Sequence, residues 1–236
     1  MRRALALSLL AGGVSLLACA SPHLVPEEER LRVTRELSGR PRWLRVSVHV
    51  GPFYADAASA LVTDQPPAEL ELLEMPGGAT INAPAADRIL PPGTPVLLRE
   101  VEFPTAGAMA RRYWTTPRYH PWARLEIPGE RRPAVLVLPQ EVRNFEDVRA
   151  ALDRVLADRD TAPDLAALPE AHRKAVARKE LVEGMGPKAV AMAWGYPERM
   201  IVDRPGGKEQ WIWAGGRRRA WLEDERLLRF EGGAAR

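Results

Sequence analysis

Apolar residues follow three different patterns along this chain. The first is an uncharged run of about 15 residues, Ala4–Ala18, rich in Leu and Ala, which is shorter than the roughly 20 residues that a membrane-spanning helix needs. Short alternating runs and then runs with helical spacing follow it. No later segment approaches that length without charges, so we expect the rest of the chain to be soluble apart from an anchor.

The alternating pattern begins at Trp43–Val50, where Leu44, Val46, Val48 and Val50 share one face. This is typical of a half-buried strand. Five further runs are strand-like and are separated by Pro and Gly: Leu70–Leu73, Thr94–Phe103, Arg111–Thr116, Ala123–Ile127 and Ala134–Leu138. Short strands with such turns predict a mostly-β module, either a small barrel or a sandwich.

Helical spacing follows from Asn144, whose side chain can cap a helix, with Asp147 three residues on. One apolar face runs along this predicted helix: Phe145, Val148, Leu152, Val155 and Leu156. It completes a first module over residues 43–157. Residues 158–168 are polar and contain a Pro, which predicts a linker.

A second unit is predicted over residues 169–233. Pro169 can open a helix that reaches about Val182, and Pro187 can open another that ends at Trp194. Four strand-like runs follow: Arg199–Asp203, Glu209–Ala214, Arg217–Glu223 and Arg226–Glu231. Gly215-Gly216 between two of these runs indicates a hairpin. The predicted fold class is α+β, with two helices and an antiparallel meander after the mostly-β module.

The N-terminus has the order of a secretory signal peptide. Arg2 and Arg3 precede the apolar run, and small residues surround Cys19. Leu16-Leu17-Ala18-Cys19 resembles the lipobox of bacterial lipoproteins. The resemblance implies removal of residues 1–18 and attachment of fatty acids such as palmitate to Cys19. The residue after the cysteine is Ala20 and not Asp. By the same resemblance, this implies an anchor in the outer membrane, with the protein facing the periplasm.

Residues 19–42 are predicted to be the lipidated cysteine and a tether, because Pro and charged residues leave no sustained apolar stripe. A short helix over Glu27–Leu37 is compatible with Pro26 at its start. Cys19 is the only cysteine, so no disulfide can form within the chain.

Charge is unevenly distributed along the mature chain. Residues 171–236 carry 14 Lys and Arg against 9 Asp and Glu, whereas residues 19–170 carry 18 against 22. Arg217, Arg218 and Arg219 form the densest basic run, with Trp213 and Trp221 nearby. They are candidates for contact with anionic lipid or an acidic partner. The alternative is a charged strand that resists edge pairing.

The last 60 or so residues resemble the SmpA/OmlA (BamE-like) family of small envelope lipoproteins. Five segments carry the resemblance: Val182–Met185, Val190, Trp194–Pro197, Gln210–Trp213 and Trp221–Glu223. The chain departs from the family's pattern at Trp213, where Tyr is common, at Gly186-Pro187, where Ser or Thr usually caps the helix, and at the helix end, Met192-Ala193-Trp194. The resemblance covers about a quarter of the chain and implies a helix–helix–meander fold and a role in outer-membrane assembly.

Residues 43–157 lie outside that resemblance. The turn Pro91-Pro92-Gly93-Thr94 is similar to SH3-like modules of bacterial envelopes. Trp211 and Trp213 share a strand face, and Val190 and Trp194 share a helix face, which favours packing in a core over binding of a ligand.

Candidate catalytic chemistry is sparse in the sequence. No two of the four histidines stand at metal-ligand spacing, and no nucleophile or nucleotide-binding motif occurs. His120, between Tyr119 and Pro121, is the one histidine in an aromatic setting, and a packing role there is favoured over a catalytic base. We therefore expect no metal, no cofactor and no enzymatic activity.

The sequence predicts a non-enzymatic envelope lipoprotein that binds or scaffolds proteins at the outer membrane. Its expected partners are the membrane, through the lipid, and outer-membrane assembly proteins or peptidoglycan; nucleic acid is not expected. One alternative is a cell-wall or glycan-binding lipoprotein, resting on the SH3-like turn. A second is a hydrolase that uses His120 with a carboxylate not identified by the sequence.

Overall fold

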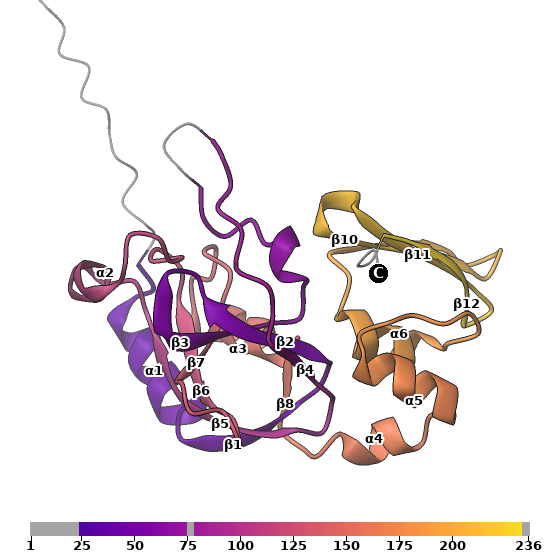
Figure 1. Cartoon of the computed structure of the whole chain (residues 1–236), viewed down its shortest axis with the longest axis horizontal. Coiled ribbons are helices and arrows are strands. Elements are labelled where there is room, and N and C mark those ends of the chain that lie inside the picture. Colours follow the sequence, from indigo (N-terminus) through magenta and orange to yellow (C-terminus); the bar gives the residue numbers. More distant parts are fainter. Residues whose placement is uncertain (1–23, 75–77, 233–236) are drawn as a thin grey trace, which may run out of the picture.

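The computed structural model describes residues 24–74 and 78–232, which form two units side by side (Figure 1). The larger unit ends near residue 157 and the smaller one follows. Both combine helices with an antiparallel or mixed sheet, which confirms the α+β class.

The larger unit contains an eight-stranded sheet in the order β4-β2-β3-β7-β6-β5-β1-β8. Its strands are β1 (Arg40–Leu44), β2 (Val48–Phe53), β3 (Asp56–Thr63), β4 (Arg88–Leu90), β5 (Pro95–Glu102), β6 (Trp122–Glu126), β7 (Ala134–Val137) and β8 (Leu156–Ala157). Neighbouring strands are antiparallel except for β3 and β7, which are parallel.

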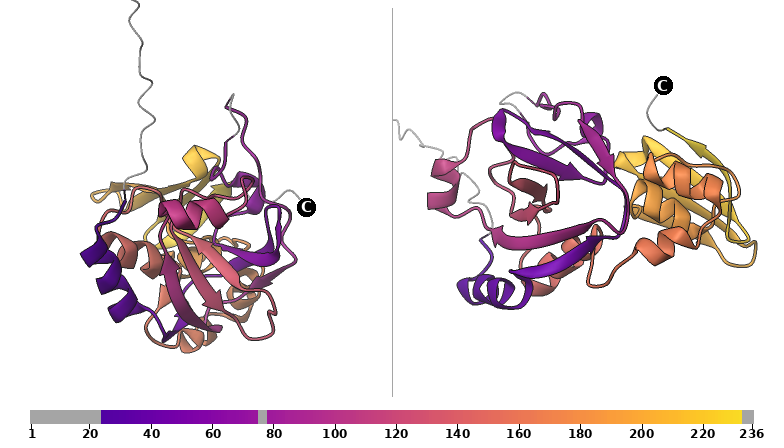
Figure 2. Two further views of the ribbon diagram at one scale, coloured as in Figure 1. Left: turned by 90° about the vertical axis from the view of Figure 1, so that its left-hand side faces the viewer. Right: turned by 60° about the horizontal axis from the view of Figure 1, so that its bottom comes forward.

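This sheet curls toward a barrel, as its connections require (Figures 1 and 2). In a flat sheet β4 and β5 would lie five strand spacings apart, or about 24 Å. Only residues 91–94 join them, and so short a connection reaches at most about 18 Å. Its Gly93 N–H donates to Leu44 O, and Leu44 N–H donates to Thr94 O, each at 2.9 Å. The connection therefore closes the gap between β4 and β1.

Two helices cover the curled sheet. Helix α1 (Glu27–Leu37) buries Val33 and Leu37, and α3 (Phe145–Asp153) buries Phe145, Val148 and Leu152. Asn144 Oδ1 accepts from the Asp147 N–H, so the predicted cap of α3 is confirmed. Helix α1 has the bounds that were compatible with Pro26 at its start. It packs against α3 and β5, so residues from Glu27 onward belong to the fold and not to a tether.

Two of the predicted strands have other conformations. Residues 106–111 form helix α2 (Ala106–Arg111), with a turn after it, where the strand Arg111–Thr116 was predicted. The predicted strand Leu70–Leu73 is coil, and it follows a short 3₁₀ turn, η1 (Pro67–Glu69). Leu70 is nevertheless buried, in a small cluster with Phe53 and Trp122 on the sheet's second face.

The smaller unit has the predicted order of helices before a meander. It contains α4 (Ala162–Ala166), α5 (Glu170–Ala177), α6 (Pro187–Trp194), β9 (Arg199–Asp203), β10 (Lys208–Trp213), a 3₁₀ turn η2 (Ala214–Gly216), β11 (Arg218–Glu223) and β12 (Arg226–Glu231). Its four strands pair in chain order as one antiparallel sheet. Helix α4 lies within the predicted linker, and Leu165 and Leu168 pack on this unit's core.

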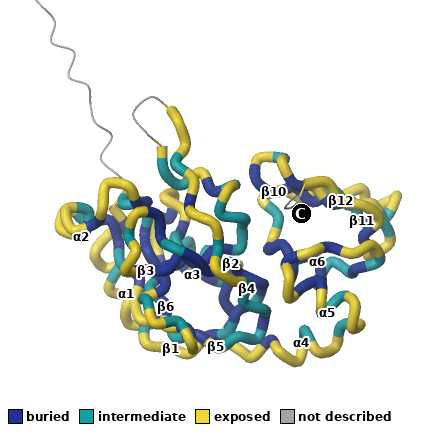
Figure 3. The backbone as a smooth tube through the Cα atoms, viewed as in Figure 1, coloured by how far each residue is buried: buried dark blue, intermediate teal, exposed yellow. Residues whose placement is uncertain are grey.

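Each unit has its own apolar core. In the smaller one, α6 buries six of its residues against Trp211 and Trp213 of β10. The core interpretation of these tryptophans is confirmed, since they are 6% and 2% exposed. Figure 3 shows exposed positions along the rim of the four-stranded sheet, away from the helices.

Candidate functional site

Lys179 joins the two units from an unusual backbone position. Helix α5 ends in two hydrogen bonds, from Glu180 N–H to Ala175 O and from Lys179 N–H to Val176 O. This pattern places residue 179 in the left-handed conformation that usually favours glycine, and Lys179 has φ 57°. The strained position directs its side chain into the other unit.

The Lys179 ammonium is buried between backbone carbonyls of both units. Its Nζ donates to Ser47 O at 2.7 Å and to Ala193 O at 2.9 Å. Burial lowers the pKa of Lys179 to about 7; the charge of Asp64 opposes this and that of Arg218 adds to it. A neutral amine has two N–H donors and can satisfy both carbonyls, so the site tolerates loss of the proton.

Ser47 and Thr161 add further bonds across the same boundary. Ser47 N–H donates to Met192 O at 2.8 Å, and Ser47 Oγ donates to Val176 O at 2.6 Å. Thr161 Oγ1 donates to Leu44 O, also at 2.6 Å. These bonds and those of Lys179 form what we call the junction, which fixes the smaller unit against β1 and β2.

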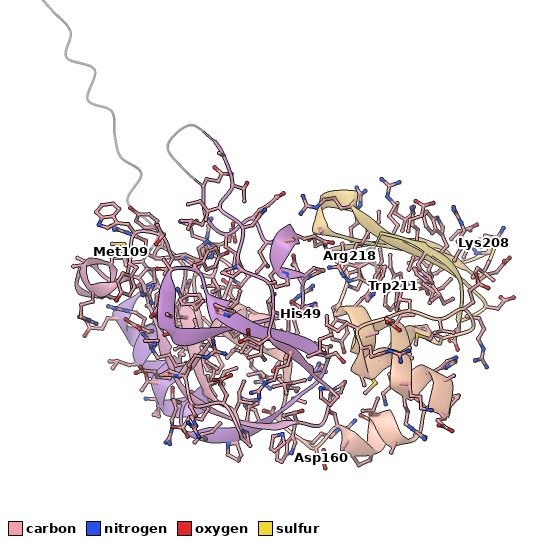
Figure 4. The ribbon with its side chains drawn as sticks, in the orientation of Figure 1. His49, Met109, Asp160, Lys208, Trp211 and Arg218 are labelled. Atoms are coloured by element: carbon pink, nitrogen blue, oxygen red, sulfur yellow. The ribbon has the colours of Figure 1, made fainter. Side chains whose placement is uncertain are left out.

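His49 and Arg218 line the junction from opposite units (Figure 4). Arg218 is 1% exposed, and its Nε donates to Glu69 Oε2 at 2.8 Å. Its guanidinium also lies 5.1 Å from the ring centroid of Trp194. Burial, then the charges of Lys179 and Arg218, lower the pKa of His49 to about 3. His49 is therefore neutral at physiological pH.

The three predicted contact arginines do not share one surface. Arg218 faces the junction, and Arg217 pairs with Glu71 of the larger unit. Arg219 is exposed. An anionic lipid could reach Arg219 and part of Arg217 but not Arg218, so the run as a whole is not a contact patch.

A groove of about 610 Å³ opens beside the junction and takes its walls from both units. Its apolar lining comes from Val46, Ala191, Met192, Tyr196 and Trp211. Its charged rim contains Arg45, Arg159, Asp164 and Lys188. The Asp164 carboxylate accepts from Arg159 at 2.6 Å and from Lys188 at 2.8 Å. Both hydrogen bonds lower the pKa of Asp164, and the one from Lys188 has the larger effect.

Strand β9 is an edge strand next to this groove, and no strand among the described residues pairs with its outer side. Met200, Ile201 and Val202 are 54%, 51% and 47% exposed. Met200 lies directly opposite Trp211 in the ladder with β10, and opposite residues point to the same face. Met200 therefore extends the apolar floor of the groove toward the open edge.

His120 lies elsewhere, beside a cavity of about 320 Å³. Its Nδ1 contacts Leu138 O at 2.9 Å, so this nitrogen carries the hydrogen. Burial lowers the pKa of His120. The ring thus connects the loop before β6 to the backbone just after β7. This contact is compatible with the packing role favoured from the sequence.

Several sequence predictions fall outside the described residues or concern groups not found among them. Cys19 and His23 precede residue 24 and cannot be placed. Within residues 24–74 and 78–232, no three or more His, Cys, Asp or Glu side chains are arranged to hold a metal ion. In the same residues no helix combines the length and apolar character needed to cross a bilayer.

The sequence did not single out Ser47, Lys179 or β9. One signal was present for β9, namely Met200-Ile201-Val202, three apolar residues in succession within a strand predicted at the end of its sheet.

Comparison with protein families, with curated proteins and with solved structures finds no match for this chain.

Proposed function

We propose that this protein is a lipid-anchored envelope lipoprotein that acts by binding a protein partner and not by catalysis. The sequence Leu16–Cys19 supports the anchor. The observation that carries the binding role is the uncovered apolar edge of β9 beside a groove built by both units. The partner would lie in the groove and pair its backbone with β9.

Edge strands with this character are uncommon on soluble surfaces. Proteins usually protect a sheet edge with charges, Pro, bulges or a covering segment, because its free N–H and C=O groups accept another strand. The centre of β9 carries three apolar residues in a row, and the side chains of its charged residues, Arg199 and Asp203, stand only at its ends. An extended peptide that adds to such an edge gains backbone hydrogen bonds there and side-chain contacts in the adjoining groove.

The outer membrane is the proposed site of action, and envelope assembly is the proposed process. Ala20 supports the first part. The order of α5, α6 and β9–β12 supports an SmpA/OmlA-like assignment of the smaller unit, because it matches the helix–helix–meander order that the resemblance implies. Under this proposal the larger unit positions the smaller one at a fixed distance from the lipid.

Site-specific crosslinking in cells tests the binding role. A photoreactive residue at Ile201 of the lipidated full chain should yield a discrete adduct with an outer-membrane assembly protein. The same residue at Lys174, exposed on α5, is the control and should not. The adduct at 201 should disappear when Met200 is changed to Lys, because a buried charge would oppose docking beside Trp211.

Other results separate the alternatives. Recovery of peptidoglycan fragments from both positions would favour the alternative hypothesis of a glycan-binding lipoprotein. No adduct at 201 in cells that retain the lipidated protein would contradict binding at β9.

A further inference from the structure

A loop with exposed aromatic residues follows α2. Thr105 Oγ1 accepts from the Ala108 N–H and caps this helix. The loop then runs from Arg112 to Pro121 and is held from within by Arg112, which is 6% exposed. The Arg112 guanidinium donates to three backbone carbonyls, those of Glu102, Arg118 and His120, at 2.8–2.9 Å. It also stacks on Trp122, 3.7 Å from the ring centroid.

The tip of this loop presents aromatic side chains to solvent. Tyr113, Trp114 and Tyr119 are 60%, 78% and 42% exposed. Arg118 lies over the rings of Trp114 and Tyr119, at 3.8 Å and 5.0 Å from their centroids. We call these four residues the aromatic tip. Large exposed aromatic groups on an ordered backbone are costly in water and mark a contact surface.

The aromatic tip follows α2, which lies on the side of the molecule where the described chain begins. Both orientations in Figure 2, and Figure 1, show α2 on the same side as the first described residues, and Figure 4 marks Met109 of α2 there. Val25 is already buried in the core, so the fold begins at that residue. The six residue steps from Cys19 to Val25 can span only about 20 Å even when fully extended. A lipid on Cys19 would hold this side of the protein close to the bilayer.

We infer that the aromatic tip is a second, non-covalent contact between this protein and the membrane that holds its Cys19 lipid. The inference rests on the lipid anchor of the proposed function. Trp and Tyr favour the headgroup region, where an apolar ring and a polar group are both satisfied. Leu24, the first described residue, is 55% exposed and adds apolar surface next to the start of the fold.

The charges on this side make the contact interfacial and not mainly electrostatic. Arg111 is exposed and Arg118 is partly exposed, so both would face lipid phosphates, but the carboxylates of Glu27 and Glu28 at the start of α1 are exposed on the same side. Opposite charges in similar number offset one another near an anionic surface. Contact through the aromatic tip should therefore persist at high salt, unlike binding by a polybasic patch.

The test uses the lipidated chain in vesicles of phosphatidylethanolamine and phosphatidylglycerol. Acylation occupies the only native thiol, so a cysteine introduced as Thr115→Cys can be labelled alone with a nitroxide. Thr115 is exposed and adjoins Trp114, which stays intact. Lys208→Cys provides the control, because Lys208 lies at the opposite end of the molecule from Met109 (Figure 4). Collision of each label with oxygen and with a water-soluble nickel complex reports its depth.

The label at 115 should collide more with oxygen than with nickel, and the label at 208 should collide mainly with nickel. Adding Tyr113→Ala and Trp114→Ala should return the label at 115 to water while leaving the melting temperature unchanged. Vesicle flotation and fatty-acid labelling report the anchor separately. If the lipidated protein floats with the vesicles but both labels remain in water, the proposed membrane contact of the aromatic tip is wrong, whereas the lipid anchor is supported. If the label at 115 collides with neither oxygen nor nickel, it is covered by protein, and the proposed membrane contact is wrong in that case too.

Discussion

Three consecutive arginines have three environments in this protein, and strand geometry explains the difference. Side chains alternate along a strand, and Arg218 lies opposite Trp213, whose ring faces the core. Arg218 therefore points inward toward Glu69, whereas Arg219 points outward. The sequence showed a basic run, but the carboxylate partner of Arg218, the partly buried Glu69, comes from a segment about 150 residues earlier.

A matched pair of substitutions tests this placement. Arg218→Ala should lower the free energy of unfolding by about 3–5 kcal/mol, because it leaves the Glu69 carboxylate without its partner at a partly buried site. Arg219→Ala should change it by less than about 0.5 kcal/mol, as is usual at exposed positions. Urea denaturation measures both. Equal effects of the two substitutions would contradict the burial of Arg218.

Lys179 predicts a pH dependence of stability. Its pKa is about 7 in the folded protein and returns to about 10.4 on unfolding. Between these values the unfolded chain holds a proton that the folded chain has released, so the free energy of unfolding rises with pH. The slope for one proton is at most about 1.4 kcal/mol per pH unit.

Substitution at position 179 isolates this contribution. Lys179→Met removes the titrating group, and Lys179→Gly also relieves the left-handed backbone. In both variants the rise in unfolding free energy between pH 7 and about 10 should be smaller than in the wild type by the contribution of this one group. Denaturant melts across that range measure it. If the free energy of unfolding of the wild type rises with pH in parallel with that of both variants, the pKa of Lys179 is not lowered in the folded protein.

At the scale of elements, the local pattern predicted the smaller unit better than the larger one. Strands β9 and β12 have the predicted bounds, β10 is shifted by one residue, and β11 begins one residue later than predicted. Local turn residues mark the boundaries: Pro205-Gly206-Gly207, Gly215-Gly216 and the polar pair Asp224-Glu225. In the larger unit, the single strand predicted over Trp43–Val50 is two strands, because Ser47 bonds to Met192 of the other unit and not to a neighbouring strand. No local pattern could reveal that bond.

The strand predicted at Arg111–Thr116 failed for a related reason. Arg112 there is held by carbonyls from β5 and from the loop before β6, which fixes a turn whatever the local β propensity. The candidate groove could not be predicted either, because its lining comes from four separate stretches of the chain, residues 45–46, 157–164, 187–196 and 211, that meet only in the fold.

The face of β10 against α6 gives an element-scale prediction. Trp213 packs edge-on against Trp194, with ring centroids 5.4 Å apart, and its Nε1 donates to Gly195 O. Trp213→Ala should lower the unfolding free energy by about 3–5 kcal/mol. Trp213→Phe keeps much of the packing but leaves that carbonyl without its donor, so it should cost less than Trp213→Ala. Thermal and urea melts rank the two, and the opposite ranking would contradict the packing.

At the scale of the whole molecule, the junction couples two units that have separate cores. Residues 165–236 contain nearly all of the smaller core, so this fragment should unfold cooperatively. It loses the hydrogen bond from Lys179 Nζ to Ser47 O and the one from Ser47 N–H to Met192 O, and Arg218 loses its partner Glu69. Its melting temperature should therefore lie below that of the full chain. Scanning calorimetry of both would show this, whereas an equal or higher value for the fragment would mean that the junction adds no stability.

Lipid attachment at Cys19 decides where both proposed contact surfaces act, and fatty-acid labelling tests it most directly. Cells that express the full chain would be given labelled palmitate, and the protein would be recovered from the membrane fraction. The wild-type chain should carry label and be shortened by the signal peptide, and Cys19→Ser should carry none and keep its full length. Absence of label on the wild type, or equal label on the variant, would contradict a lipid-anchored protein.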